Sequence, residues 1–239
     1  MNQINQQIGL YYNYIHYMYL CDIMKMAYSI LVRKILLIDK RYFSKEEIKD
    51  ICVKLKLSYT SAINYLLTNK YIYRIFRGFF YVPSIEERKL NSTTPIVFEA
   101  ISKAMEYKKI KNWYFGLETA IKNSNITHES FSIDYVISDT IFRPKPIIIL
   151  GRKIKFIKLK KDLCNFGIKK EKYPFSDLEK TILDIAYLKK YSSENNASIK
   201  EYLTEWTEKS DKKKLCEYSK KYPKTIKFLA EELKCSRKT

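Results

Sequence analysis

The sequence predicts an α+β protein of two domains, with three helices and a hairpin in the first and a mixed α/β second domain that ends in helices. Apolar residues recur at helical spacing between residues 25 and 68, strand-like runs follow between residues 131 and 168, and Lys- and Glu-rich helical patterns complete the chain. A chain of 239 residues is long enough for two domains that each bury a core.

Net charge indicates the class of partner. The chain has 45 Lys and Arg against 26 Asp and Glu, a formal net charge of +19, and both halves are basic. A polyanion such as nucleic acid is therefore the expected partner. The alternative is a Lys-rich surface in a sequence biased toward Lys, Ile and Tyr, which would also account for 21 Tyr and only 5 Gly.

Residues 1–24 are predicted to be a leader rich in aromatic residues, and residues 1–21 carry no formal charge. The leader lacks the basic start and small-residue cleavage site of a signal peptide. Asp22 and Lys25 interrupt any extension toward the roughly 20 apolar residues that cross a bilayer. We expect an accessory or disordered arm and no membrane partner, and a true start near Met24 or Met26 is the alternative.

The cysteines indicate a reducing compartment. Cys21, Cys52, Cys164, Cys216 and Cys235 lie far apart, without a C-x-x-C pair, and the sequence has only two His. Neither a metal site nor disulfides are expected, and the cytoplasm is the expected location.

Three helices are predicted from Lys25 onward. The first runs from Lys25 to Ile38, and its expected buried face is Ala27, Ile30, Leu31, Ile35 and Ile38. The second, from Lys45 to Lys56, begins with a capping box in which the side chains of Ser44 and Glu47 each accept a bond from the other's backbone N–H. Its expected buried residues are Ile48, Ile51, Cys52 and Leu55.

The third helix is predicted from Tyr59 to Thr68, after a short break with Ser58 as its N-cap. Its inward face is Ala62, Ile63, Leu66 and Leu67, and its polar outward face is Thr60, Ser61, Asn64, Tyr65 and Thr68. Residues 71–76 and 79–82 then form a hairpin around the turn at Arg77 and Gly78. This order of elements predicts a winged helix-turn-helix over residues 25–84.

A winged helix predicts double-stranded DNA as the ligand. Asn64 suits a bidentate contact with adenine, and Thr60 and Ser61 suit base edges or phosphates. Arg74 and Arg77 suit backbone or minor-groove contacts. The predicted DNA-binding residues are Ser58, Tyr59, Thr60, Ser61, Asn64, Tyr65, Thr68, Lys70, Arg74 and Arg77. The alternatives are a solvated third helix and a protein-docking module.

The second domain is predicted over residues 95–239, after a polar boundary at residues 84–94. Pro95 fits the first turn of a helix that is capped by Thr94 and reaches about Tyr107. A second helix is expected to start near Phe115 and to end before Asn123. Strands are expected at residues 131–137, 146–149, 152–159 and 165–168.

The chain is predicted to end in helices. A second capping box, Ser176 with Glu179, opens a helix to about Lys190, and two or three helices follow over residues 197–234.

Basic and apolar residues alternate along the strand predicted at residues 152–159. One face is therefore expected to be buried, and the other to carry Arg152 or Lys153, Lys155, Lys158 and Lys160. These side chains either extend a phosphate footprint, with Arg152, Lys153, Lys155 and Lys158 as contacts, or form a solvated face of the sheet.

Four segments in order carry a resemblance to a known family: YRIFRGFFYVP (73–83), WYFGLETA (113–120), IFRP (141–144) and FSDLEKTILD (175–184). Together they resemble the AbiE-type antitoxins, transcriptional regulators of type IV abortive-infection toxin–antitoxin systems, over roughly residues 25–190. The resemblance implies a winged helix that represses its own operon through inverted repeats. It also implies a C-terminal antitoxin-type domain that neutralises a nucleotidyltransferase toxin, without requiring a stable complex. The leader and the helices beyond Ala197 depart from the family pattern.

Catalysis is not expected. A restriction-type nuclease needs an acidic residue and then an acid-x-Lys on a neighbouring strand to hold Mg²⁺. After Asp134 and Asp139, the next strand carries no acid. No Walker loop, G-x-G-x-x-G or G-x-S-x-G is present, so we expect no cofactor.

The acids near residue 180 have structural explanations. Asp177 and Glu179 fit a helix start, and Asp184 fits an i,i+4 pair with Lys180. The sequence therefore predicts an operon-autoregulating repressor and antitoxin. The alternatives are a plain transcriptional regulator and a DNA-processing enzyme or its specificity subunit.

Overall fold

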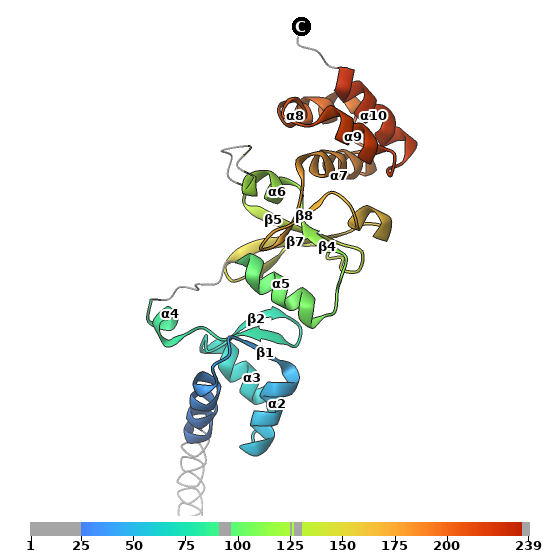
Figure 1. The fold of residues 1–239 in the computed structure, drawn as a ribbon. Helices are drawn as coiled ribbons and strands as arrows, with labels where there is room; N and C mark the ends of the chain where they lie inside the picture. The colour runs from blue at the N-terminus through green and yellow to red at the C-terminus, as the bar shows by residue number, and fades with distance from the viewer. Residues whose placement is uncertain (1–24, 91–96, 125, 127–130, 236–239) are drawn as a thin grey trace, which may run out of the picture. The chain divides into compact units, whose positions relative to one another are not determined.

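The structure, a computed structural model, describes residues 25–90, 97–124, 126 and 131–235. The chain divides into two compact units, Met1–Ile96 and Val97–Thr239 (Figure 1). Both units combine helices with a sheet, so the protein is α+β. The predicted leader, and the predicted cap and first turn at Thr94 and Pro95, lie outside the described residues. None of the helices in these ranges has the length and apolar character that a bilayer span requires.

The first unit is a small helical domain with a sheet. Its described elements are a helix over residues 25–37, β1 (Tyr42–Ser44), α2 (Lys45–Lys54), α3 (Tyr59–Thr68), β2 (Tyr73–Phe76), β3 (Phe79–Tyr81) and α4 (Ile85–Lys89). The strands described here form an antiparallel sheet in the order β1-β3-β2. Strand β1 was not predicted, because three residues are too few to show a periodicity and only their pairing with β3 defines the strand. Helix α4 was not predicted either, although Ser84 and Glu87 form a capping box that the sequence pattern indicates.

Local sequence signals set the limits of α2 and α3. The capping box at the start of α2 is confirmed, because Glu47 N donates to Ser44 Oγ at 3.3 Å and Ser44 N donates to Glu47 Oε2 at 2.8 Å. Helix α2 ends at Lys54, two residues before its predicted end, and Lys56 has a positive φ of 55°. Helix α3 has its predicted limits, and the break between the two helices spans residues 55–58.

The buried face of the first helix differs from the predicted one. Ile30 is 38% exposed and Ile38 is 42% exposed, whereas Tyr28 and Val32 are buried. The Tyr28 ring stacks on Tyr65 of α3 at a centroid distance of 4.6 Å. Because Tyr28 faces α3, the buried face of the first helix is not the face that the spacing of its apolar residues indicates.

The second unit is a mixed sheet with helices on both faces. Its described elements are α5 (Val97–Tyr107), β4 (Trp113–Phe115), α6 (Glu118–Asn123), β5 (Ile133–Ser138), β6 (Ile147–Ile149), β7 (Arg152–Lys158), the 3-10 turn η1 (Lys161–Cys164), β8 (Ile168–Lys170), β9 (Pro174–Ser176), α7 (Leu178–Tyr191), α8 (Asn196–Glu208), α9 (Lys212–Ser219) and α10 (Lys224–Cys235). The described strands lie in the order β6-β7-β5-β4-β9-β8. The β5–β7 and β4–β9 pairs are parallel and the other pairs are antiparallel.

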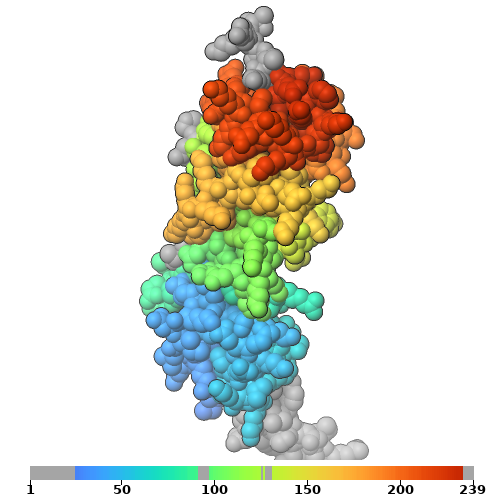
Figure 2. Space-filling view, turned by 45° about the vertical axis from the view of Figure 1, so that its right-hand side comes forward, coloured from blue at the N-terminus to red at the C-terminus, as the bar shows by residue number. Residues whose placement is uncertain are grey.

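Helix α5 covers one face of this sheet, where Phe98 packs on Phe115 of β4 and Phe175 of β9. On the other face, Tyr114 and Ile137 share a core with α7 and with the helices beyond it (Figure 1). In the space-filling view the C-terminal helices, coloured red, form one continuous layer (Figure 2). Helix α7 is therefore covered by the sheet on one side and by helices on the other.

Two predictions for this unit are wrong. The helix expected from near Phe115 begins at Glu118, because Phe115 belongs to β4 and pairs with Val136. The capping box expected from Ser176 is absent, because Ser176 lies in β9 and Asp177 is the N-cap of α7. The Asp177 side chain accepts from Lys180 N at 2.9 Å.

Candidate nucleic-acid interface

Helix α3 presents a polar face to solvent. Thr60, Ser61, Asn64 and Thr68 are exposed, opposite the buried residues Ala62, Ile63 and Leu66. These exposed side chains carry hydroxyl and amide groups, which can both donate and accept hydrogen bonds.

Tyr65 differs from its predicted outward position. Its ring is half-buried and stacks between Tyr28 at 4.6 Å and Tyr71 at 5.9 Å. The ring joins the first helix, α3 and the start of the hairpin, so its main contacts are within the unit.

The first turn of α3 leaves its backbone N–H groups open to an anion. Ser58 is exposed at the N-cap position, but its side chain makes no capping bond, and the first turn contains no acid. Lys45 Nζ lies 5.8 Å from the ring centroid of the half-buried Tyr59. Partial burial raises the pKa of Tyr59, and the positive charge of Arg74 opposes that rise. Two cations therefore lie near this helix end, whose dipole also favours negative charge.

The hairpin adds exposed basic residues beside α2. Arg74 on β2 and Arg77 in the turn are both exposed, and Gly78 supplies the positive φ of 80° that the turn needs. The carbonyl oxygen of Gly78 accepts from Lys45 N at 2.8 Å, which fixes the hairpin turn against the start of α2. Lys70, also exposed, follows α3 with a φ of 54°.

A buried polar network holds the base of the hairpin. Glu87 of α4 is 4% exposed and accepts from Tyr81 Oη, with an Oη–Oε1 distance of 2.8 Å. The Arg41 guanidinium donates to both of these side chains and to the carbonyl oxygen of Val82. Sequence patterns did not reveal this network, because Arg41 lies about 40 residues before its partners.

The charge of this unit suits a polyanion. Residues 25–90 contain 14 Lys and Arg against 6 Asp and Glu. Among those acids, Glu47 is paired with Lys40 and Glu87 with Arg41. This excess of basic residues produces an attractive potential for phosphates.

The basic residues of β7 do not form one patch. Register with β5 places Lys153 and Lys155 on one face, whereas Arg152 and Lys158 belong to the opposite face. Arg152 is paired with the buried Asp134, with Nε–Oδ2 at 2.6 Å. Lys155 donates to the carbonyl oxygen of Pro144, and Lys153 and Lys158 are exposed.

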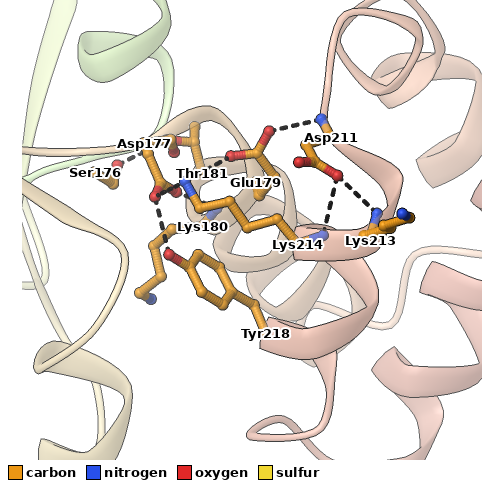
Figure 3. Close-up of polar contacts among 9 residues, drawn as sticks. All are labelled: Ser176, Asp177, Glu179, Lys180, Thr181, Asp211, Lys213, Lys214 and Tyr218. Atoms are coloured by element: carbon orange, nitrogen blue, oxygen red, sulfur yellow. Dashed lines mark hydrogen bonds and ion pairs between the residues drawn. The ribbon is translucent and has the colours of Figure 1, made fainter.

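Asp177 and Glu179, at the start of α7, link this helix to α9 through hydrogen bonds and ion pairs (Figure 3). Asp177 accepts from Tyr218 at 3.2 Å and is paired with Lys214 at 2.8 Å. Glu179 accepts from Asp211 N at 2.8 Å and lies 3.3 Å from Lys214 Nζ. Partial burial would lower the pKa of Lys214, but the hydrogen bond and charge of Asp177, with Glu179, raise it.

The predicted i,i+4 pair of Lys180 and Asp184 is present, but it is completely buried, with Nζ–Oδ1 at 2.5 Å. Asp184 also accepts from Tyr114 Oη and Tyr222 Oη, each at 2.7 Å. The rings of Tyr114, Phe166 and Tyr222 surround Lys180 Nζ at 4.9–5.3 Å. Burial lowers the pKa of Lys180, and the charge of Asp184 opposes this shift.

Comparison with known proteins extends only to the fold. No family model matches the chain, and no curated protein sequence matches it. The structure is similar to the crystal structure of the Rv2827c protein from Mycobacterium tuberculosis, with a TM-score of 0.57 and 11% sequence identity. The match covers 87% of this chain and 76% of that one. At this identity the likeness concerns the arrangement of helices and strands.

Proposed function

We propose that the protein is a DNA-binding transcriptional repressor and that its first unit is a winged helix-turn-helix. Helices α2 and α3 would be the helix-turn-helix, and the hairpin of β2 and β3 would be the wing. The observation that carries the proposal is the exposed polar face of α3, with Thr60, Ser61 and Asn64, in the same unit as a hairpin with exposed Arg74 and Arg77. Such a face matches the hydrogen-bonding edges of bases in the major groove.

Binding assays on two DNA duplexes test this proposal. Fluorescence anisotropy would compare the DNA upstream of the gene with a scrambled duplex, each over a range of salt concentrations. We expect tighter binding to the upstream DNA and a linear fall of log K with log salt. Salt-independent binding, or equal affinity for both duplexes, would contradict a sequence-specific repressor.

Two variants separate base contacts from phosphate contacts. Arg77→Ala should weaken binding to both duplexes and reduce the salt slope by about one unit. Asn64→Ala should cost about 1–3 kcal/mol mainly on the upstream DNA. Equal losses on the two duplexes for Asn64→Ala would refute base readout by this side chain.

Lys54→Ala is the matched control for lost charge. Lys54 is exposed in the last turn of α2, nine residues after Lys45, which touches the hairpin turn. It therefore lies roughly 13 Å further along the helix. We expect this variant to keep the wild-type affinity and salt slope.

We further propose, from the family resemblance, that the second unit serves as an antitoxin against a nucleotidyltransferase toxin. Two of the segments that carry the resemblance, residues 113–120 and 175–184, contain Tyr114, Lys180 and Asp184 of the buried network. In this reading the protein is not an enzyme and acts in the cytoplasm.

Co-expression with a neighbouring toxin gene tests the antitoxin role. Rescue of growth supports it, and persistent growth arrest with an intact repressor would leave a plain transcriptional regulator. Metal-dependent cleavage of plasmid DNA by the purified protein would instead identify a DNA-processing enzyme.

A further inference from the structure

A pocket of about 520 Å³ opens beside strand β8 at one edge of the sheet in the second unit. Its walls come from the segment before β4, the loop between η1 and β8, and the connection from β8 to β9. This volume is within the range of small-molecule sites, roughly 300–1,000 Å³. The pocket lies outside the unit to which we assign DNA binding.

Trp113 provides an aromatic wall. Its ring is half-buried, lines the pocket and packs edge-on against Phe115 at 5.3 Å, which fixes its orientation. Phe166 also lines the pocket, but its ring already lies 4.9 Å from Lys180 Nζ and 4.2 Å from Lys221 Nζ. Trp113 is therefore the ring better placed to stack on a planar ligand.

Two lysines and an asparagine line the same pocket as Trp113. Lys111, in the segment before β4, and Lys170, the last residue of β8, are exposed and line the pocket. Asn165 adds an amide group that can both donate and accept.

Glu171 is the acid among the lining residues, so the lysines leave the pocket positive. Its carboxylate can accept a hydrogen bond from a sugar hydroxyl or from the amino group of a base.

We propose that this pocket binds a nucleotide, with the base stacked on Trp113 and the phosphates held by Lys111 and Lys170. A planar aromatic wall combined with two lysines matches a ligand that is aromatic at one end and anionic at the other. Inorganic phosphate has no ring that could stack on the indole of Trp113, and a nucleoside has no phosphate group for the lysines to bind.

The sequence provides a local reporter for the test. Trp113 and Trp206 are its two tryptophans, and Trp206 is 4% exposed in the core of the C-terminal helices. The variant Trp206→Phe therefore isolates the fluorescence of Trp113. ATP, AMP, adenosine and inorganic tripolyphosphate would each be titrated into this variant, and calorimetry on the wild-type protein would measure the same affinities.

We expect saturable quenching of Trp113 by ATP and AMP, with weaker binding of adenosine and tripolyphosphate. Lys111→Ala and Lys170→Ala should each weaken ATP binding at least tenfold. Lys209→Ala is the matched control, because Lys209 is exposed at the C-cap of α8 and is not among the residues that line the pocket. This control should bind ATP as the wild type does.

Three results would overturn the proposal: no saturable signal with any nucleotide at millimolar concentration, tripolyphosphate binding as tightly as ATP, or affinity for ATP that is unchanged in both lysine variants. Thermal unfolding checks that the variants remain folded. The Trp113 signal reports on the second unit, so failure here leaves the DNA-binding proposal intact.

Discussion

Removing Asp184 should destabilise the second unit severely. The Lys180–Asp184 pair is 0% exposed, and Asp184 is the acceptor for Tyr114 Oη and Tyr222 Oη as well as the partner of the ammonium group. Asp184→Ala leaves a buried cation without its anion, which costs about 3–5 kcal/mol. It also removes the acceptor of two buried hydroxyl groups, at about 1–3 kcal/mol for each one left unsatisfied. The total approaches the whole stability of a domain, about 5–15 kcal/mol.

Lys180→Met should be milder than Asp184→Ala. The carboxylate of Asp184 would keep the hydroxyl donors of Tyr114 and Tyr222, and methionine replaces the aliphatic part of the lysine side chain. The double variant Lys180→Met with Asp184→Leu removes both charges and should be more stable than Asp184→Ala alone.

Urea unfolding measures these differences. Trp206 fluorescence reports on the core in which α7 and the C-terminal helices pack, and circular dichroism follows the helices. The control is Lys209→Ala, which breaks an exposed i,i+4 pair with Glu205 and should cost about 0.5 kcal/mol or less. A cost of less than about 1 kcal/mol for Asp184→Ala, or additive contributions of the two charges in a double-mutant cycle, would contradict this prediction.

Three further changes probe other parts of the fold. Ser44→Ala removes the cap of α2 and should lower the unfolding free energy of the first unit by about 1 kcal/mol in urea; an unchanged midpoint would contradict the cap. Gly167→Ala should be more destabilising than Gly151→Ala. Both residues have a positive φ, but a Cβ at Gly167 would lie 2.7 Å from the Cβ of Lys180, whereas the space at Gly151 is open; equal midpoints would refute this packing argument. Burial raises the pKa of Tyr222 well above its ordinary value of 10.0, so its stabilising contribution is complete below pH 10 and is lost as the pH rises above it. Tyr222→Phe should therefore make the fall of stability above pH 10 shallower, and an unchanged slope in urea titrations would refute the assignment.

Local patterns were enough to predict part of the candidate interface. The spacing of Ala62, Ile63 and Leu66 fixes which side of α3 is buried, so it also predicts that Thr60 and Asn64 are exposed. The hairpin turn was also predictable from local sequence, because its Gly78 has a positive φ, which favours glycine. The hydrogen bond from Lys45 N to the Gly78 carbonyl, which sets the hairpin beside α2, could not be predicted from local sequence patterns.

The sequence by itself determined the features that depend on neighbours within a few residues: helices α2 and α3, the capping box at Ser44, the hairpin turn and the basic character of both units. Tertiary structure decided the rest. Strand β1 exists through its pairing with β3, and the first helix is turned by the stacking of Tyr28 on Tyr65. Lys180 carries the pattern of a surface i,i+4 pair, yet it is buried because the sheet and the C-terminal helices cover α7. Burial depends on residues that are distant in sequence, and periodicity along one helix does not contain that information.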